Sequence, residues 1–385
     1  MGFYRGKGNG IPYQDYIDFI NYVFGMNGQD MAFDRLLPKL YAPGRDPMSD
    51  NIVILEDGKL RAAVGVYTME QMVCGEKLRA VGIGNVAVHP YTRSKGYMKE
   101  TMKMTVEDAV SSGADFSVLG GSRHRYSYFS YESVAPEYIF SVTRTDLRHC
   151  MGSAHPAAVC RARVVTSGED PVLDNIYHLY NAQPLHVRRT REDLWDILRT
   201  WFHRVVVFEK NDVFYGYMLV REDTVSEWMP ADGADLADAV RAVFGLMEER
   251  EKLQFRVPPF RTDLMRALWP LAEGHVFRNS GNYSVFRYDR VCNAFLKLKR
   301  QYSVLEDGKL TLRIYGTGGE ENLRFSVAGE KAGVIPCGDA PALELSHKEA
   351  MDLLFADWSP RRNDLPAFAA AWFPLPLYQY PVDGV

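Results

Sequence analysis

The sequence predicts an α+β protein built on mixed, mostly antiparallel sheets, and three observations lead to that prediction. Residues 1–150 contain signals for a helix, a hairpin, a strand, a helix, a strand, a short helix and a strand, in that order. Residues 151–285 repeat this outline in weaker form, and from about Phe286 a helix, several strands and another helix follow. Because 385 residues exceed what one core usually serves, we expect three consecutive domains, 1–150, 151–285 and 286–385.

Each element of the first region has a signal of its own. YQDYIDFINYVFG places apolar residues at helical spacing. NIVILEDGKLRAAVGVYTMEQ places two apolar runs around Asp57-Gly58, a pair that favours a tight hairpin because glycine tolerates positive φ. EKLRAVGIGNVAVHP predicts a strand that ends at Pro90, and the stretch from Ser94 to Gly113 predicts a helix. ADFSVLGG, RHRYSYF and EYIFSVTR then predict a buried strand, a short helix and a strand.

The later regions give similar signals. LDNIYHLYN predicts a helix, RVVVFEKNDVFYGYMLVRED a hairpin, LADAVRAVFGLMEER a helix and KLQFRVP a strand. Beyond residue 286, DRVCNAFLKLK predicts a helix, YSVLEDGKLTLRIY, NLRFSVAG and AGVIP predict strands, and SHKEAMDLLFADW predicts a helix. LEDGKL occurs at both 55–60 and 305–310, so we expect the same tight turn at both places.

Composition and charge argue against several classes of protein. The 45 Lys and Arg residues against 49 Asp and Glu give a formal net charge of −4, which offers no electrostatic reason to expect nucleic acid or an anionic membrane as partner. The chain shows neither an apolar run of membrane-spanning length nor a signal-peptide core. We therefore expect cytoplasmic localisation, with reduced thiols at the five scattered cysteines, Cys74, Cys150, Cys160, Cys292 and Cys337.

The stretch AVHPYTRSKGYMKET, residues 87–101, joins a strand to a helix through a basic loop that contains a glycine. Backbone N–H groups converge at a helix N-terminus and the helix dipole adds positive potential, so a junction of this kind binds phosphate. Gly96 allows the backbone to approach a ligand closely, while Arg93 and Lys95 supply charge. The alternative is an ordinary solvated loop with a basic edge, because many strand-to-helix turns carry Arg and Gly.

Two segments together resemble the GNAT acyltransferase superfamily. VAVHPYTRSKGYM is similar to the strand and Arg/Gln-x-x-Gly-x-Gly/Ala loop of those enzymes, and RYSYFSYE to their Tyr-x-x-x-Gly-Phe-Glu element. The resemblance implies a splayed strand to whose edge the pantetheine of acetyl-coenzyme A adds, with the pyrophosphate on the loop. Met98 replaces the third glycine of the motif, which leaves the backbone donors in place. By this resemblance pantetheine binds at Val86, Ala87 and Val88, and pyrophosphate at Arg93, Ser94, Lys95, Gly96, Tyr97 and Met98.

The order of regions resembles the enhanced intracellular survival (Eis) family, a multidomain branch of the superfamily. GKLTLRIY, NLRFSVAG and LELSHKEAMDLLFADW are similar to its C-terminal part. The resemblance implies two GNAT-like mixed-sheet domains in tandem, the second degenerate, and a C-terminal α/β domain like sterol carrier protein. It also implies a homo-oligomer, a hexamer.

Transfer of an acetyl group from a thioester to an amine needs a base and an acid on opposite sides of the carbonyl. An ammonium group with a pKa of about 10 cannot attack, and the thiolate leaves more easily once protonated. By resemblance, Tyr126 is the acid that protonates the coenzyme A sulfur, and the terminal carboxylate of Val385 is the base. The alternatives are a core tyrosine and a frayed tail. We read His124 as a surface residue.

By resemblance, the acceptor is a primary amine on an aminoglycoside-like small molecule, a polyamine or a lysine. Two other functions stay open: a non-catalytic scaffold that binds coenzyme A, and a lipid carrier, since FAAAWFPLPLY is apolar enough to line a cavity or to dock the tail. His149 and His155 flank Cys150, but their spacing and the lack of a supporting carboxylate argue against a metal site.

Overall fold

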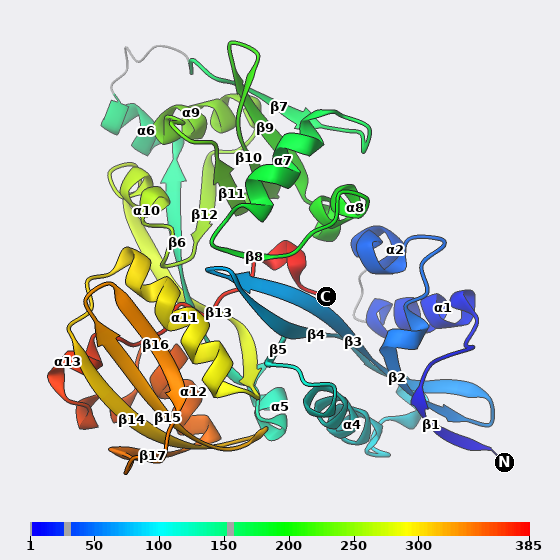
Figure 1. The fold of residues 1–385 in the computed structure, drawn as a ribbon. Coiled ribbons are helices and arrows are strands. Elements are labelled where there is room, and N and C mark those ends of the chain that lie inside the picture. The colour runs from blue at the N-terminus through cyan, green and yellow to red at the C-terminus, as the bar shows by residue number, and fades with distance from the viewer. Residues whose placement is uncertain (1, 27–31, 152–157) are drawn as a thin grey trace. The chain divides into compact units, whose positions relative to one another are not determined.

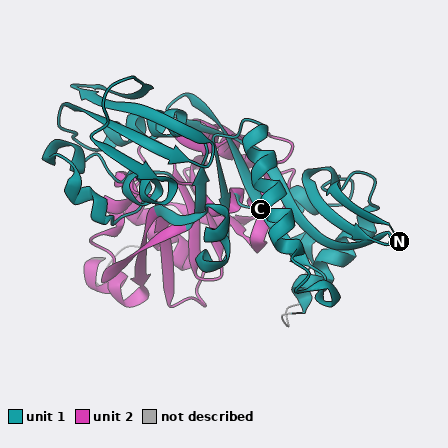
Figure 2. Ribbon diagram, turned by 90° about the horizontal axis from the view of Figure 1, so that it is seen from below, with its two compact units in different colours: residues 1–135, 281–377, 384–385 teal, residues 136–280, 378–383 magenta. Residues whose placement is uncertain are grey.

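The computed structural model describes residues 2–26, 32–151 and 158–385, and contacts between Cα atoms divide the chain into two units (Figure 2). Unit 1 is made of Met1–Ala135, Gly281–Leu377 and Gly384–Val385, and unit 2 of Pro136–Ser280 and Tyr378–Asp383. Each unit therefore contains segments that are distant in sequence. The three consecutive domains expected from the sequence, with limits at 150 and 285, stay a prediction.

A mixed sheet forms the N-terminal part of unit 1, in the order β1-β2-β3-β4-β5-β13. Its strands pair antiparallel except β4 and β5, which run parallel. The hairpin expected at Asp57-Gly58 is confirmed, because both residues have positive φ, 52° and 72°, and join β2 to β3. The strands are β1 (Phe3–Lys7), β2 (Asn51–Glu56), β3 (Lys59–Val73), β4 (Glu76–Val88), β5 (Phe116–Leu119) and the end of β13 (Gly274–Val285).

Helix α4 (Tyr97–Ser111) packs on β2, β3 and β4 (Figure 1). It lies within the helix expected between residues 94 and 113, and a short 3-10 helix (Pro90–Thr92) precedes it. Buried side chains of the helix and the strands form the core here, with Met102 against Val64, Val81 and Ile83. The other helices of this part are α1 (Tyr13–Gly25), α2 (Phe33–Leu36), α3 (Pro38–Tyr41) and α5 (Arg123–Tyr126).

The second part of unit 1 is a four-stranded sheet in the order β16-β15-β14-β17, with α11 packed on β15 and β16 and α12 on β14 and β17 (Figure 1). Helix α12 begins at a capping box in which the Ser346 side chain and Glu349 bond to each other's backbone N–H groups. The elements are α11 (Tyr288–Tyr302), β14 (Gly308–Gly316), β15 (Gly319–Ala328), β16 (Lys331–Pro336), β17 (Leu343–Ser346), α12 (His347–Phe355) and α13 (Ala367–Ala370).

The turn expected at the second LEDGKL is wrong. At residues 55–60 the hexapeptide joins two strands, but at 305–310 it follows the end of α11 and enters β14. The residues before it continue the helix to Tyr302, so no strand precedes the Asp-Gly pair. Asp307 instead accepts a hydrogen bond from the N–H of Gly329, at 2.8 Å.

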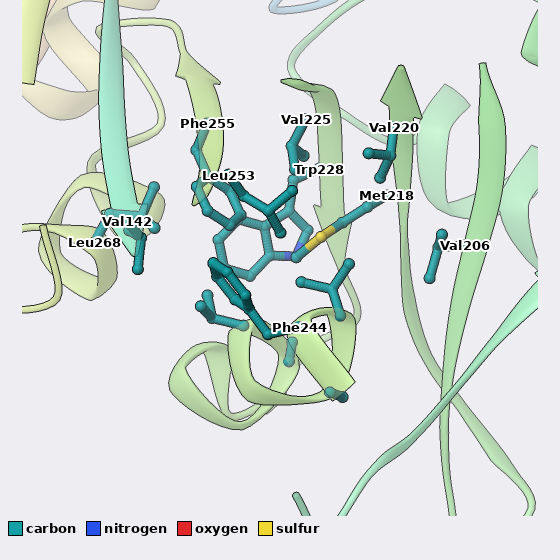
Figure 3. Close-up of a cluster of buried hydrophobic side chains, with 14 of the residues drawn as sticks. Val142, Val206, Met218, Val220, Val225, Trp228, Phe244, Leu253, Phe255 and Leu268 are labelled. Carbon is teal, nitrogen blue, oxygen red and sulfur yellow. The ribbon is translucent and has the colours of Figure 1, made fainter. Parts of the chain in front are cut away.

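Unit 2 holds strands in the order β6-β12-β11-β10-β9-β7, of which β11 and β12 run parallel. Trp228 is a packing residue at the centre of the core of unit 2. Met218, Phe244 and Leu253 surround it (Figure 3). The elements are β6 (Glu132–Thr143), α6 (Arg144–Met151), β7 (Arg161–Val165), α7 (Val172–Asn181), β8 (Leu185–Val187), α8 (Leu194–Leu198), β9 (Arg204–Lys210), β10 (Val213–Arg221), β11 (Thr224–Pro230), α9 (Leu236–Leu246), β12 (Lys252–Val257) and α10 (Thr262–Leu268).

Candidate active site

Strand β4 separates from β5 partway along its length. The two strands pair from Ala80↔Phe116 to Ile83↔Leu119, whereas β4 continues to Val88. On its other side the pairing with β3 shifts, so that two residues of β4, Asn85 and Val86, lie opposite one residue of β3. Asn85 has a φ of 50°, and such a β-bulge bends the strand that carries it. The described pairing with β5 ends where the bulge begins, which exposes an edge to which an extended ligand can pair.

A cleft of about 1050 Å³ lies along this edge and over the start of α4. It is large enough for a cofactor, since ligand pockets typically measure several hundred to about 1,000 Å³. Among the residues expected to bind the cofactor, those that line it are Val86, Val88, Arg93, Ser94, Gly96, Tyr97 and Met98. The sequence did not indicate the other lining residues, Val23, Phe24, Thr92, Lys99, Arg125, Tyr128 and Phe129.

The start of α4 suits an anion. Gly96 is the N-cap residue with a φ of 82°, a conformation that glycine adopts without strain, and it has no side chain to cap the helix. The first N–H groups of a helix have no carbonyl partner within the helix, so here they are available to a ligand. Arg93, Lys99 and Arg125 line the same cleft and add positive charge. Backbone donors and three cations together favour a pyrophosphate or phosphate group.

Two residues expected at the cofactor do not line the cleft. Lys95 Nζ bonds to both carboxylate oxygens of Glu56, at 2.8 and 3.1 Å, and this bond lowers the pKa of Glu56. Ala87 is buried, so only the backbone of this residue can contact a ligand. Both residues still belong to the segment that forms the cleft, but their side chains stabilise the fold.

Tyr126 ends α5 and belongs to the same buried cluster as Ile83, Leu119 and Met102. It does not itself line the cleft, although its neighbour Arg125 does. Burial raises the pKa of its phenol above the ordinary value, and Arg125 offsets part of that shift. The hydroxyl therefore keeps its proton at neutral pH, as a general acid must. His124 is exposed, as expected.

The C-terminus lies against β4. A Cβ atom added at Gly84 would come within 3.0 Å of the terminal carboxyl carbon of Val385, and one at Gly82 within 2.7 Å of a Val385 methyl group. Because Gly82 and Gly84 have no side chains, there is space beside β4 for Val385. Lys39 Nζ donates to the carbonyl oxygen of Gly384 at 2.7 Å, which holds the tail from a second side.

The register of the sheet places Tyr126 and Val385 on opposite faces. Side chains alternate along a strand, and directly paired residues share a face. Val81 and Ile83 belong to the core that contains Tyr126 and α4, so Gly82 and Gly84, which contact Val385, point to the other face. A thioester held where β4 and β5 separate would thus have a phenol on one side and a carboxylate on the other.

Three tyrosines that the sequence did not indicate lie on the Val385 face. Tyr67 follows Gly65 by two residues, and Gly65 pairs with Gly84. Its hydroxyl bonds to the hydroxyl of Tyr41 at 2.5 Å and accepts a bond from Asn51 Nδ2 at 3.2 Å. The Tyr16 hydroxyl donates to Asn51 Oδ1 at 2.7 Å, and Asn85 Nδ2 donates to it at 3.5 Å. This buried polar network packs beside the bulge of β4.

Among the described residues, no group of three or more His, Cys, Asp and Glu side chains has the geometry to hold a metal ion. His149 lies in α6, whereas His155 falls outside the described residues. All five cysteines are free thiols. None of the described helices combines the length and the apolar character needed to cross a bilayer.

Comparison with known proteins identifies the N-terminal region. Residues 12–134 match the acetyltransferase (GNAT) domain, so the chain contains a GNAT domain with its mixed sheet, and it is an N-acetyltransferase. GNAT domains use an acyl-coenzyme A. No curated protein sequence matches the chain.

Solved structures resemble the chain over most of its length. A GCN5-related N-acetyltransferase from Anabaena variabilis superposes with a TM-score of 0.65 at 15% identity, covering 100% of each chain. A GCN5-related N-acetyltransferase from Kribbella flavida gives 0.62 at 13% identity, covering 91% of this chain and 88% of its own. Eis1 from Mycobacterium abscessus gives 0.60 at 14% identity, covering 100% of each. At these identities the likeness shows the fold.

Proposed function

We propose that the chain transfers the acetyl group of acetyl-coenzyme A to a primary amine at the separation of β4 and β5. The observation that carries this proposal is the position of the terminal carboxyl group, whose carbon lies within 3.0 Å of a Cβ atom added at Gly84. The same strand lines the cleft with Val86 and Val88. One short segment thus has a cofactor-sized cleft on one face and a base on the other.

Each proton carrier has one task. The Val385 carboxylate accepts a proton from the attacking amine, which makes the nitrogen lone pair available to the carbonyl carbon. The C–N bond forms, a tetrahedral intermediate develops, and the C–S bond breaks. Tyr126 then gives its proton to the departing sulfur, which leaves as a thiol. Burial supports this role, because it raises the pKa of Tyr126 and so keeps the phenol protonated.

The cofactor subsites follow from the cleft. Pantetheine pairs with the open edge at Val86, Ala87 and Val88, and the pyrophosphate binds the N-terminus of α4. The proposed pyrophosphate loop consists of Arg93, Ser94, Lys95, Gly96, Tyr97 and Met98. Lys95 contributes only its backbone, because Glu56 holds its side chain.

The wider architecture we propose is that of the Eis family. Unit 2 supports a degenerate second GNAT-like fold, because β9, β10, β11, α9, β12 and α10 repeat the order of β2, β3, β4, α4, β5 and α5. The region from α11 to α13 is the proposed sterol-carrier-like domain. The resemblance also underlies a proposed homo-hexamer, which light scattering would test. A fold likeness to Eis1 from Mycobacterium abscessus is compatible with this assignment.

The apolar run FAAAWFPLPLY favours a structural role over lipid carriage. Trp372, Leu375 and Leu377 are fully buried. Trp372 Nε1 donates to the carbonyl oxygen of Glu306 at 3.0 Å, and Phe373 contacts Phe325 edge to face. These side chains fill the interior of their own unit, so we propose that they fix the tail.

An acetylation screen tests the function. The purified chain is incubated with acetyl-coenzyme A and aminoglycosides, polyamines or lysine peptides, and release of free thiol is followed. We expect turnover with at least one amine class. Tight binding of acetyl-coenzyme A without turnover of any amine would instead support the scaffold. Displacement of a fluorescent fatty acid would support the lipid carrier.

A further inference from the structure

The bulge at Asn85 decides which side chains of β4 line the cleft. Side chains alternate along a regular strand, so Asn85 would lie on the same face as Ile83, which belongs to the core shared with α4. Instead Val86 packs against that core, and Val88 packs with Tyr97 at the start of α4. The extra residue of the bulge shifts the alternation by one, so Val86 and Val88 line the cleft in place of Asn85.

The side chain of Asn85 is held on the opposite face by Tyr16 of α1. Asn85 Nδ2 donates to the Tyr16 hydroxyl at 3.5 Å, and 8% of Asn85 and 0% of Tyr16 is exposed. The Tyr16 hydroxyl donates in turn to Asn51 Oδ1 at 2.7 Å, and Asn51 Nδ2 donates to the carbonyl oxygen of Pro47 at 2.6 Å. Burial raises the pKa of the Tyr16 phenol well above its ordinary value, so the hydroxyl keeps the proton that it donates to Asn51.

A second contact on this face fixes the neighbouring strand. Gly65 pairs with Gly84, the residue before Asn85, and a Cβ atom at Gly65 would overlap the ring of Tyr67. The Tyr67 hydroxyl accepts a bond from Asn51 Nδ2 at 3.2 Å. Asn51 therefore links the ring over β3 to the side chains that hold the bulge. These polar groups are buried, so a different arrangement would leave some of them unpaired at the cost of their desolvation.

We propose that Tyr16 and Asn51 are positioning residues for acetyl-coenzyme A, which act through Asn85 on the open edge of β4. All three residues belong to unit 1, as does the cleft, and neither Tyr16 nor Asn51 lines it. The inference rests on the proposed function, because it takes pantetheine to pair with this edge.

The mechanism is a shift between two arrangements of β4. A φ of 50° is tolerated by asparagine but is not its preferred conformation, so the bulge needs support. Without the bond to Tyr16, Asn85 can turn toward the cleft and the alternation of the strand changes. The fraction of chains whose edge can bind pantetheine then falls, and the apparent affinity for the cofactor falls in proportion. The start of α4 does not depend on this bond.

Tyr16→Phe tests the proposal, since it removes the hydroxyl and keeps the ring. We expect calorimetry to show a Kd for acetyl-coenzyme A about tenfold higher, the scale of one lost buried hydrogen bond. The Kd of 3′-phospho-ADP, the nucleotide part of coenzyme A without pantetheine, should stay within about twofold of the parent. A merely destabilised protein would lose affinity for both ligands alike. Equal losses for both ligands, or an unchanged Kd for acetyl-coenzyme A, would overturn the proposal.

Asn85→Gly tests the same contact from the strand. Glycine adopts a φ of 50° without strain, so the variant removes the side chain that Tyr16 holds and leaves the bulge sterically allowed. We expect the same selective loss of affinity for acetyl-coenzyme A, even if Tyr16→Phe does not fold. Parent-like affinity of Asn85→Gly would show that the bulge needs no side-chain support, and would overturn the proposal.

Tyr288→Phe is the matched control. Tyr288 is fully buried in the same unit and its hydroxyl bonds to His347 Nδ1 at 3.1 Å, so this variant also loses a buried hydrogen bond. Tyr288 begins α11 and does not line the cleft, so both affinities should stay within about twofold of the parent. An equal selective loss here would overturn the specific role of Tyr16.

The same titrations separate this inference from the proposed function. If the parent chain does not bind acetyl-coenzyme A, the proposed function is wrong and this inference falls with it. If the parent binds acetyl-coenzyme A and both Tyr16→Phe and Asn85→Gly bind it equally well, only the role of Tyr16 and Asn51 is wrong.

Discussion

At the scale of single residues, Tyr126 is the clearest test of the chemistry. Its phenol is buried, and burial raises its pKa, so it holds a proton throughout the neutral range. We expect Tyr126→Phe to lower turnover by roughly 10²-fold, the usual scale for loss of a positioned acid. Calorimetry should show unchanged affinity for acetyl-coenzyme A, because Tyr126 does not line the cleft. A variant with normal turnover would assign the tyrosine to the core alone.

Gly84 offers a second test that leaves every titratable group in place. A methyl group at this position would lie 3.0 Å from the carboxyl carbon of Val385, so Gly84→Ala should displace the terminal carboxylate. We expect turnover to fall about tenfold, on the scale of a misplaced base, with cofactor affinity retained. Gly245→Ala is the control, since its Cβ would meet nothing within 4 Å. Equal activity of the two variants would argue against a base at this position.

The sequence predicted the residues of the cleft better than it predicted what surrounds them. Val86, Val88 and Gly96 belong to one local motif, so their proximity needed no knowledge of the fold. The partner of Lys95 is Glu56, which lies 39 residues earlier and carries no signal of its own. Tyr16, Tyr41 and Tyr67 come from three separate elements, and their hydroxyls meet only once α1 and α3 pack beside β3.

At the scale of elements, helices α4 and α9 differ in how they begin. Helix α4 follows β4 and helix α9 follows β11, but α4 begins after Gly96, an N-cap residue without a side-chain cap. Helix α9 begins at Asp235, whose carboxylate accepts the N–H of Asp238. That carboxylate occupies the place of an anion and would repel a phosphate.

We therefore expect one acetyl-coenzyme A per chain. Isothermal titration calorimetry should give a stoichiometry near one, and Gly96→Val should weaken binding because valine tolerates a φ of 82° poorly. Gly233→Val is the matched control, since Gly233 has a φ of 74° in the loop before α9 and its Cβ would meet nothing within 4 Å. Two equivalent sites per chain would contradict the account of α9.

The hexapeptide LEDGKL shows the limit of local signals at this scale. The Asp-Gly pair forms a turn at 57–58 because an apolar run on each side can pair as strands. At 307–308 the residues before the Asp-Gly pair end an amphipathic helix. The same hexapeptide therefore leads from a loop into a strand. Turn chemistry permits a hairpin, and the flanking residues decide whether one forms.

At the scale of the whole molecule, the sequence indicated the order of the elements but not how they group. Met1–Ala135, Gly281–Leu377 and the last two residues belong to one unit, and Pro136–Ser280 and Tyr378–Asp383 belong to the other. Such grouping depends on long-range packing, which apolar periodicity does not encode. The tail illustrates the point, because the sequence left a frayed tail open as an alternative, and yet Tyr378, Tyr380 and Val382 are buried.

Buried tyrosines give the molecule a predictable response to alkali. Tyr16, Tyr41 and Tyr67 are buried in unit 1, and Tyr180 and Tyr217 in unit 2. Burial raises the pKa of each phenol, to about 12 for Tyr67, whereas an unfolded tyrosine titrates near 10. Above pH 10 the unfolded chain loses protons that the folded chain keeps. Stability is therefore complete below pH 10 and falls as the pH rises toward 12.

Tyr67→Phe isolates one of these groups. Each pKa unit corresponds to about 1.4 kcal/mol, so between pH 10 and 11 the parent should lose about 1 kcal/mol of unfolding free energy that this variant does not lose through residue 67. Urea unfolding at pH 8, 10 and 11 measures the two slopes. The variant starts from a different baseline, because Tyr41 and Asn51 lose a hydrogen-bond partner. Only the change with pH is compared, and identical slopes would mean that Tyr67 titrates alike in both states.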